Sequence, residues 1–378
     1  MAEPNPTGGS ASGPAGNPSG ANGRSGRTPA AEGLAAQGIA APTPAAPTPA
    51  VPTPAVPTPA VPTPAVPTPA APTPAVPTPP ALPPLIVGCW SWGDERTWGY
   101  RSRFGDDDLR AAVRALDAAG LRWFDTAEVY GRGRSERLLG DLTADLPGAA
   151  VSTKFFPYPW RLTGSGFRRG LASALRRLRR DRVELYQAHH EVPAPLARRW
   201  AGHLAAARRD GLVGAIGTSN LSAPALRAFS DALAEHGERV TAHQTRYNLC
   251  DRRVERHGVV ELCRERGITL LAHSALAQGL LSGRYRAGAP MTGRRPIPDP
   301  VLAQTAPLLA LLDRVADRLD ATPAAVALAW LRHRGATPVV GVHDRAQAED
   351  AAVAARLVLP GSAAAALDKV SAPWRGRP

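Results

Sequence analysis

Short apolar segments alternate with helical patterns from about residue 85 to residue 369, and this alternation constrains the fold more than any other feature. The segments that we expect to form strands are 85–90, 121–126, 149–154, 183–189, 214–219, 240–244, 269–274 and 337–342. Strands that alternate with helices along a chain form parallel sheets. Eight such units favour an α/β fold of the closed (β/α)8 type, a TIM barrel, over an open doubly wound sheet.

The intervening segments carry the helical spacing of apolar residues. We expect helices over 106–119, from about Ser135, and over 167–179, 195–209, 223–236, 252–266, 302–319, 323–333, 345–355 and 361–369. The motif GxGxxG does not follow the first strand segment, so the usual Rossmann route to a dinucleotide is missing.

Residues 1–81 have a different composition from the rest of the chain. They begin with Gly, Ser, Asn and Pro and pass into a PTPAV-type repeat over about 42–80. This segment carries too little apolar area to offset the entropy lost on ordering. We expect a disordered Pro/Ala/Thr-rich tail whose repeat is extended and polyproline-like. This tail is a passive linker or, alternatively, a spacer or docking ligand. We expect residues 82–378 to form one barrel domain.

Composition argues against several classes of protein. The net charge is +13, but the arginines are spread over many expected helices and no nucleic-acid-binding motif is visible, so we expect no nucleic-acid partner. No apolar stretch reaches the length of a membrane span. We expect no classical secretion signal, because the N-terminal residues lack a basic segment followed by an apolar one. The three cysteines are widely spaced and form no CxxC motif, which argues against a zinc site or a disulfide framework. Because unpaired cysteines are typical of reducing compartments, we predict a cytoplasmic protein without a metal.

Four residues with acid, base or cationic side chains stand at or near the ends of three strand segments. Asp125 and Tyr130 follow the second, Lys154 ends the third and His189 ends the fourth. The C-terminal strand ends of a βα barrel share one mouth, so these side chains should meet there. Lys154 is also one of only two lysines in an arginine-rich sequence, the other being Lys369, which sets it apart from a routine surface cation.

With these residues in place, the chain resembles an aldo-keto reductase over about 85–356. The motifs that carry the resemblance occur in family order: FDTAEVYGRGRSERLLG at 124–140, VSTK at 151–154, LYQAH at 185–189, GTSN at 217–220, YNL at 247–249, SALAQGLLSGRY at 274–285 and VVG at 339–341. The resemblance implies a reductase that takes a small-molecule aldehyde or ketone.

The resemblance also implies a role for each of the four residues at the barrel mouth. Tyr130 is the general acid that protonates the carbonyl oxygen, and an ordinary phenol pKa near ~10 is too high for this work at neutral pH. Lys154 lowers that pKa, Asp125 holds Lys154 charged and oriented, and His189 polarises the carbonyl.

By the same resemblance, a nicotinamide cofactor lies along the later strand ends. The residues implied to contact it are Ser219, Asn220, Gln244, His273, Ser274, Leu276, Gly279, Gly341, His343, Arg345 and Gln347. Three positions depart from the family pattern. His273 stands where a stacking tyrosine is common, and His343 and Ala351 stand where an arginine and an asparagine are frequent. We expect imidazole to stack in place of the phenol and Arg345 to compensate at the adenosine end, so we favour NADPH over NADH.

Simpler roles compete with each of these assignments. Asp125, Ser219 and Asn220 could be helix caps. Tyr130 could simply pack in its loop, and Gln244 could be an ordinary polar residue at a strand end. Strand alternation should put His189 and its neighbour His190 on opposite faces, and motif spacing selects His189. Aromatic residues near the strand ends could line a substrate pocket or simply pack in the core; they are Trp90, Trp92, Phe156 and Trp160.

We therefore expect an NADPH-dependent oxidoreductase that reduces an aldehyde or ketone to an alcohol. The alternative is a non-catalytic NADP(H)-binding module with a redox-sensing role, tethered by the proline-rich tail. The complete set of four residues at the mouth favours the enzyme.

Overall fold

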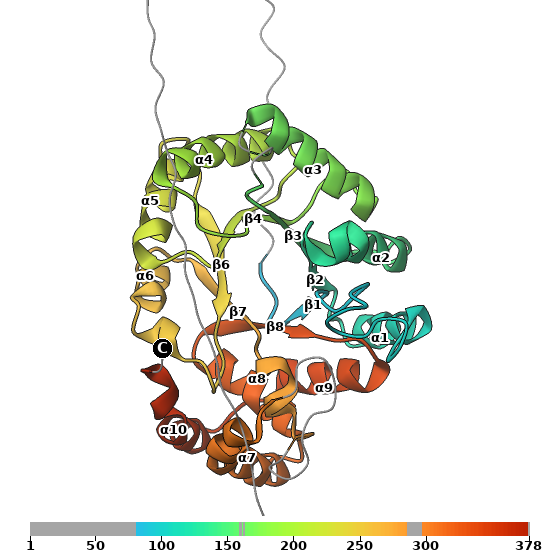
Figure 1. The fold of residues 1–378 in the computed structure, drawn as a ribbon, viewed down its shortest axis with the longest axis vertical. Helices are drawn as coiled ribbons and strands as arrows, with labels where there is room; N and C mark the ends of the chain where they lie inside the picture. The colour runs from blue at the N-terminus through green and yellow to red at the C-terminus, as the bar shows by residue number, and fades with distance from the viewer. Residues whose placement is uncertain (1–80, 159–160, 162, 286–296, 377–378) are drawn as a thin grey trace, which may run out of the picture. The chain divides into compact units, whose positions relative to one another are not determined.

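The structure, a computed structural model, describes residues 81–158, 161, 163–285 and 297–376, and its strands close into a parallel barrel (Figure 1). The strands pair in chain order, and β1 closes the barrel by pairing with β8 through Ile86 and Val339. Their bounds are β1 Ile86–Gly88, β2 Trp123–Asp125, β3 Ala150–Phe155, β4 Leu185–Ala188, β5 Ile216–Ser219, β6 Val240–Arg246, β7 Thr269–His273 and β8 Ala336–Gly341. The expected (β/α)8 barrel is confirmed. The expected tail, residues 1–81, lies outside the described residues except for Ala81.

The helices surround the strands, as Figure 1 shows. Their bounds are α1 Asp106–Ala118, α2 Arg134–Leu142, α3 Gly164–Leu178, α4 Ala194–Arg209, α5 Ala223–Ala234, α6 Val259–Glu265, α7 Asp299–Arg318, α8 Pro323–His333, α9 Arg345–Arg356 and α10 Gly361–Val370. One expected helix was wrong: 252–266 is split into a 3-10 turn, η3 (Arg253–Glu255), and the short helix α6. Gly258, with a φ of 73°, takes a left-handed conformation that an α-helix cannot continue through.

Helix α1 illustrates why these segments are helical. Its buried residues Leu109, Ala112, Val113 and Leu116 recur every three or four positions and so form one apolar stripe. Three aspartates occupy its first turn, where the positive end of the helix dipole favours negative charge. The stripe packs in the large core between helices and barrel.

The barrel interior has two layers of different chemistry. The lower layer is apolar and takes residues from nearly every strand: Ile86, Trp123, Leu185, Ala215, Ala242, Leu271 and Val339. Because side chains alternate along a strand, residues two positions further along point into the same interior. On β2, β4 and β6 these are Asp125, Gln187 and Gln244, all buried. The interior therefore becomes polar toward the C-terminal strand ends.

A buried arginine fixes the C-terminal helices to the barrel. The side chain of Arg252 is fully buried and pairs with Glu255 (Nε to Oε1, 2.7 Å) and Asp368 (Nη2 to Oδ1, 3.2 Å). It also donates to Ser371 Oγ (2.7 Å), and its guanidinium lies 5.0 Å from the ring centroid of Trp330. Full pairing offsets the cost of burying this charge.

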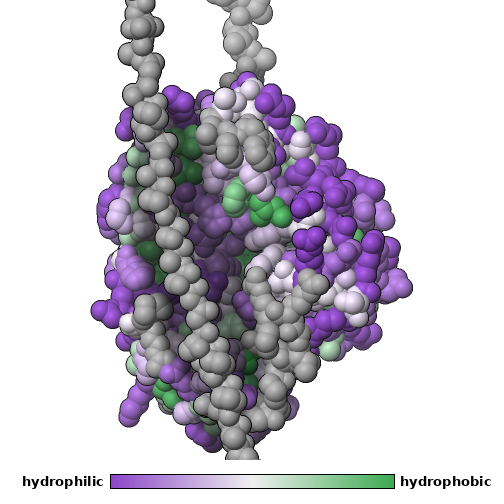
Figure 2. Space-filling view, viewed as in Figure 1, coloured by the Kyte–Doolittle hydropathy of each residue, from purple (hydrophilic) through white to green (hydrophobic). Residues whose placement is uncertain are grey.

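Figure 2 shows a mainly hydrophilic visible face with small apolar patches. Among the described helices, none is by itself long and apolar enough to cross a membrane. The pair α9 and α10 passes that test only when taken together, and the two helices are bent by 114°.

Candidate active site

The four acid, base and cationic residues meet at the C-terminal strand ends. Asp125 is the last residue of β2, Lys154 lies next to the end of β3, and His189 directly follows β4. Tyr130 begins the 3-10 turn η1 (Tyr130–Gly133) after β2. The expected convergence is therefore present in the structure.

Lys154 and Asp125 form a buried ion pair. The ammonium of Lys154 donates to Asp125 Oδ1 and to the carbonyl oxygen of Thr126 (2.9 Å). It also lies 5.2 Å from the ring centroid of Tyr130. Burial alone would lower the pKa of Lys154, but the charges of Asp125 and Tyr130 outweigh burial and raise it. The cation is thus held charged beside the phenol.

The pKa of Tyr130 differs from the sequence-based expectation. Burial raises it most, the charge of Lys154 lowers it, and Asp125 raises it again, so the net pKa lies above the ordinary value of 10. Lys154 acts in the expected direction, but the expected net lowering was wrong because the phenol is buried. The phenol therefore keeps its proton at neutral pH and has one to donate, although its raised pKa makes it a weaker acid than a free phenol.

His189 lies beside Tyr130, with 5.9 Å between ring centroids in an edge-on arrangement. Burial, followed by the charge of Lys154, lowers the pKa of His189 to about 2. The imidazole is therefore neutral at physiological pH and offers a hydrogen bond rather than a charge. Within the described part of the chain, its buried Nδ1 has no hydrogen-bond partner.

The expectation that His189 and His190 face opposite ways was wrong. Their rings stack 4.8 Å apart at 10°. Strand β4 ends at Ala188, so the alternation of side chains no longer applies to either histidine. Phe156 packs edge-on against both rings, at 5.7 Å and 5.4 Å.

Asp125 receives hydrogen bonds from three neutral side chains in addition to Lys154. Its Oδ2 accepts from Ser152 Oγ (3.0 Å), Gln187 Nε2 (3.1 Å) and Gln244 Nε2 (3.1 Å). The alternative that Asp125 caps a helix is excluded, because Gly133 precedes α2 at the cap position. Gln244, expected at the nicotinamide, uses its amide nitrogen on Asp125.

A second polar network joins the ends of β5 and β7. Asn220 Nδ2 donates to Ser219 Oγ (2.9 Å) and to the carbonyl oxygen of His189 (3.2 Å). Its Oδ1 lies 2.9 Å from His273 Nε2, and His273 Nδ1 lies 3.1 Å from Ser274 Oγ. Burial lowers the pKa of His273 to about 3, so this imidazole is neutral as well.

Ser219 and Asn220 do not cap the next helix. That position belongs to Ser222, whose hydroxyl oxygen accepts from Ala225 N. The helix-cap alternative for the two residues was therefore wrong. Asn220 instead takes a left-handed backbone conformation, with a φ of 56°, that turns its carboxamide toward His273.

The loop after β7 contains several left-handed residues. Ser274 has a φ of 56°, and Ala277, Gln278 and Gly279 follow at 49°, 59° and 94° within the turn η4 (Ala277–Ser282). Leu276 packs partly buried against the core. Turns that mix left- and right-handed residues direct successive backbone N–H groups into concavities that suit anions.

The predicted adenosine-end residues lie around the start of α9. Gly341 ends β8, and Gln347 bonds to the helix cap Asp344 through Nε2 (2.9 Å). The ring of His343 lies 4.3 Å from that of Phe104, tilted by 35°, and beside the Gln347 amide. Arg345 is exposed and pairs with Glu349 one turn along α9 (2.8 Å), so its guanidinium is directed along the helix surface.

The aromatic residues expected to line a substrate pocket divide into two groups. Trp90 is exposed, with its ring 6.1 Å from that of Tyr130, and Phe156 contacts His189. Trp92 is fully buried and donates to Val342 O (2.8 Å), so its expected contact with substrate was wrong and it packs in the core. Trp160 lies outside the described residues.

Three residues near the site were not predicted from the sequence. Trp98 packs edge-on against Trp90 at 5.3 Å. Glu128 accepts from Phe156 N (2.8 Å) and pairs with Arg161 (2.9 Å), so it holds the loop after β3 near Tyr130. Gln187 could have been found, because it lies two positions after Leu185, an apolar residue on the inward face of the same strand.

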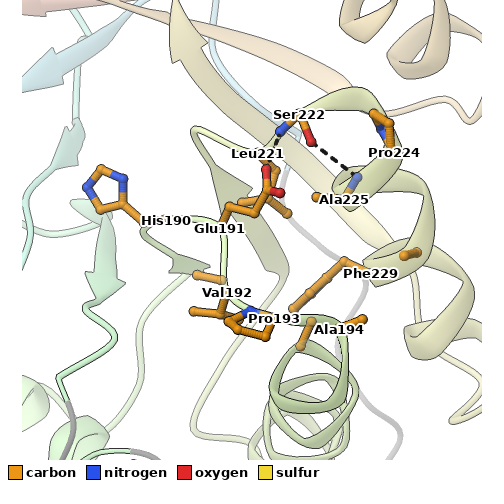
Figure 3. Close-up of a pocket in the computed structure, with 13 residues that line it drawn as sticks. His190, Glu191, Val192, Pro193, Ala194, Leu221, Ser222, Pro224, Ala225 and Phe229 are labelled. Atoms are coloured by element: carbon orange, nitrogen blue, oxygen red, sulfur yellow. Dashed lines mark hydrogen bonds between the residues drawn. The ribbon is translucent and has the colours of Figure 1, made fainter.

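A cavity of about 610 Å³ lies beside this cluster, between the β4–α4 loop and the first turns of α4 and α5 (Figure 3). Val192, Leu221 and Phe229 give it mostly apolar walls. The carboxylate of Glu191 accepts from Ser222 N (2.9 Å), as the dashed line in Figure 3 shows. His190 belongs both to this lining and to the stack with His189.

No cluster of three or more metal-ligating side chains occurs within the described ranges. Cys89, Cys250 and Cys263 are free thiols. The fold and the site together define a βα barrel whose mouth holds a neutral acid, a buried ion pair and a neutral imidazole.

Comparison with known proteins places this architecture in a family. The model of the aldo/keto reductase family matches residues 84–372. The chain is 33% identical over 286 residues to a chloroplastic pyridoxal reductase of Arabidopsis thaliana, covering 71% of this chain and 78% of the relative. It is 35% identical over 258 residues to an uncharacterized oxidoreductase of Mycobacterium tuberculosis, covering 65% of this chain and 75% of the relative. The chain belongs to the aldo/keto reductase family.

Solved structures share the fold. A glycerol dehydrogenase from Gluconobacter oxydans superposes with a TM-score of 0.65 at 23% identity, over 78% of this chain and 93% of that one. An aldo/keto reductase from Klebsiella pneumoniae, in complex with NADP and acetate, gives a TM-score of 0.61 at 24% identity, over 77% of this chain and 92% of that one.

Proposed function

We propose that this protein is an NADPH-dependent reductase that converts an aldehyde or ketone to an alcohol. The observation that carries the proposal is the buried Lys154–Asp125 pair beside the protonated Tyr130 and the neutral His189. Family membership supports oxidoreductase chemistry, and the barrel domain is proposed to span residues 82–378 with residues 1–81 as a separate tail. The reduced thiols are in keeping with the predicted cytoplasmic location.

The residues of this chain divide the acid/base work among them. Tyr130 gives its phenol proton to the carbonyl oxygen as negative charge develops there. The phenolate that remains is stabilised by the Lys154 ammonium, which Asp125 keeps charged. His189, being neutral, donates a hydrogen bond to the same oxygen and orients the substrate. A bound nicotinamide supplies the hydride.

The polar groups at the later strand ends fit a nicotinamide carboxamide. Ser219 Oγ accepts from Asn220 and keeps its own hydroxyl proton for a carboxamide oxygen. Asn220 has committed both amide protons, so it offers only an oxygen, to which a carboxamide N–H can donate. The left-handed turn around Gly279 suits a pyrophosphate, and we propose that Leu276 lies beside it.

The residues expected at the adenosine end of the cofactor support NADPH less strongly than those at the nicotinamide end support a nicotinamide cofactor. Arg345, which we expected to compensate for His343, is paired with Glu349. It is exposed, so a 2′-phosphate could compete for it. The complex of the Klebsiella relative with NADP agrees with this preference.

The substrate is proposed to be an aldehyde with a planar or apolar body. Trp90, Phe156 and the His189–His190 stack place aromatic surface around the Tyr130 phenol. Two relatives are named for aldehyde substrates: the pyridoxal reductase and, at 28% identity over 275 residues, an Escherichia coli L-glyceraldehyde 3-phosphate reductase. Pyridoxal and simple benzaldehydes are therefore suitable first substrates.

The test is NADPH oxidation with a panel of aldehydes and ketones, comparing wild type with Tyr130→Phe. Loss of the general acid should lower kcat by roughly 10²–10⁴-fold while NADPH binding is retained. Tyr247→Phe is the matched control, because this phenol bonds to Glu255 and packs on Trp330 instead of joining the acid/base cluster. NADPH binding without turnover by wild type would instead support the redox-sensing alternative.

A further inference from the structure

The two oxygens of Asp125 have different surroundings. Oδ1 accepts from the Lys154 ammonium, whereas Oδ2 accepts from Ser152, Gln187 and Gln244. A carboxylate is symmetric, so its orientation is set only by its neighbours. Three neutral donors on one oxygen leave the other oxygen for the cation and define a single orientation of the group.

Of the three donors to Oδ2, Gln187 is the one with no second acceptor in the described part of the chain and no proposed contact with the cofactor. Ser152 has one hydroxyl proton, and Phe124 O competes for it at 3.3 Å. Gln244 is proposed to lie at the nicotinamide. Gln187 is fully buried, and its strand register places it between Lys154 on β3 and Gly217 on β5.

The amide orientation of Gln187 follows from electrostatics. Its Nε2 donates to Asp125, and its buried Oε1 has no hydrogen-bond partner among the described residues. Reversing the amide would turn Oε1 toward a carboxylate oxygen and replace attraction by repulsion. Either orientation leaves one amide atom of Gln187 unpaired, so the attraction between Nε2 and the carboxylate of Asp125 decides the orientation.

Gly217 provides the space that this side chain needs. A Cβ on Gly217 would lie 2.8 Å from Gln187 Cγ and 3.1 Å from Ala242 O. Any larger residue would therefore push Gln187 away from its position on the neighbouring strand. The glycine at position 217 of β5 thus leaves room for the Gln187 side chain in its observed position.

We propose that Gln187 is a positioning residue of the acid/base cluster, which holds Asp125 so that Oδ1 stays on Lys154 and the ammonium stays beside Tyr130. This inference rests on the proposed carbonyl reduction for its kinetic consequence, although the effect on Lys154 is independent of any substrate. Without the Gln187 donor, only Ser152 and Gln244 remain on Oδ2, so Asp125 is held less firmly, the ion pair loosens and the buried ammonium is less well compensated.

The primary test observes Lys154 itself in the protein without cofactor. Lys154 and Lys369 are the only lysines in the sequence, so lysine labelled with ¹³C and ¹⁵N gives two side-chain signals, and Lys369→Arg assigns them. Gln187→Met keeps the volume and removes the donor. We expect the Lys154 signal to titrate about one pH unit lower in this variant than in wild type.

A second variant and a control protect this test against a general loss of structure. Gly217→Ala should produce the same shift through steric displacement of Gln187. Gln304→Met makes the same chemical change on the exposed surface of α7 and should leave the Lys154 titration unchanged. A purely structural role of Gln187 would lower the melting temperature but leave the titration of Lys154 as in wild type.

Kinetics then separate this inference from the proposed function. With an aldehyde that wild type reduces, Gln187→Met should lower kcat about tenfold or more with KM and the NADPH dissociation constant nearly unchanged. Equal kcat and equal Lys154 titration in wild type and Gln187→Met would overturn the inference. If wild type reduces no carbonyl, the proposed reductase is wrong, and the Lys154 titration still decides the role of Gln187.

Discussion

Acid should destabilise this protein through buried neutral histidines, and His243 on β6 is the best one to isolate. It is fully buried, its Nδ1 lies 2.8 Å from Thr218 Oγ1, and burial lowers its pKa to about 4. In the unfolded chain the pKa returns to the ordinary value of 6.5. Below pH 6.5 the unfolded state therefore binds a proton that the native state does not bind.

The sign and size of the pH effect on the free energy of unfolding follow from this difference in proton binding. The stability contribution is intact above pH 6.5 and is lost as the pH falls, because protonation favours the unfolded state. At pH 5 the 1.5 units below the unfolded pKa correspond to about 2 kcal/mol, at ~1.36 kcal/mol per unit. His243 alone should thus lower the free energy of unfolding by about 2 kcal/mol between pH 7 and pH 5.

The assay is urea unfolding at several pH values between 7 and 5, for wild type and for His243→Asn. The asparagine amide can keep the bond to Thr218 but does not titrate. Other histidines contribute equally to both proteins and cancel in the comparison. The pH dependence of wild type should exceed that of the variant by nearly one proton at pH 5, and equal slopes would refute the buried neutral imidazole.

Two further outcomes follow from the buried polar networks. Arg252→Met should destabilise the protein by about 3 kcal/mol, measured by calorimetry, because the buried guanidinium that joins Glu255, Asp368 and Ser371 is lost. Of its described ion-pair partners, Glu255 then keeps the more exposed Arg334 and Arg375. The exposed pair Arg227–Glu265 supplies the control Arg227→Met, which should melt as wild type does. His273→Ala should weaken NADPH binding about tenfold, measured by fluorescence titration, because the Asn220 carboxamide loses its Nε2 partner and is no longer held in place. Unchanged affinity in this variant would contradict the role given to His273.

The sequence revealed those parts of the structure that depend on local pattern. Alternation within strands and apolar stripes on helices are short-range properties, so eight strands and most helices could be predicted to within a few residues. The convergence of Asp125, Lys154 and His189 followed from the rule that parallel strands end at one mouth. No detail of side-chain packing was needed for it.

The errors occurred where the local pattern stops. Trp92 lies four residues beyond the end of β1 and His190 lies two residues beyond the end of β4, where alternation no longer predicts a side-chain direction. The hydrogen bonds to Asp125 were also invisible, because Gln187 and Gln244 lie 62 and 119 residues further along the chain. Only closure of the barrel in one register brings them together. The raised pKa of Tyr130 likewise depends on burial, which sequence position alone does not reveal.

The Arg252 network also bears on the order of events during synthesis. Arg252 precedes its partner Asp368 by 116 residues, so a ribosome adding about 5–20 residues per second makes that partner on the order of 10 s later. For most of that interval β8 has yet to be made or paired, and the guanidinium that will be buried stays in water. The nascent barrel is then an incomplete sheet with an open edge, the state in which chaperones and proteases act on it. Synthesis of α10 and of the residues just after it, Ser371 and Trp374, brings the last partners of Arg252 and ends that exposure.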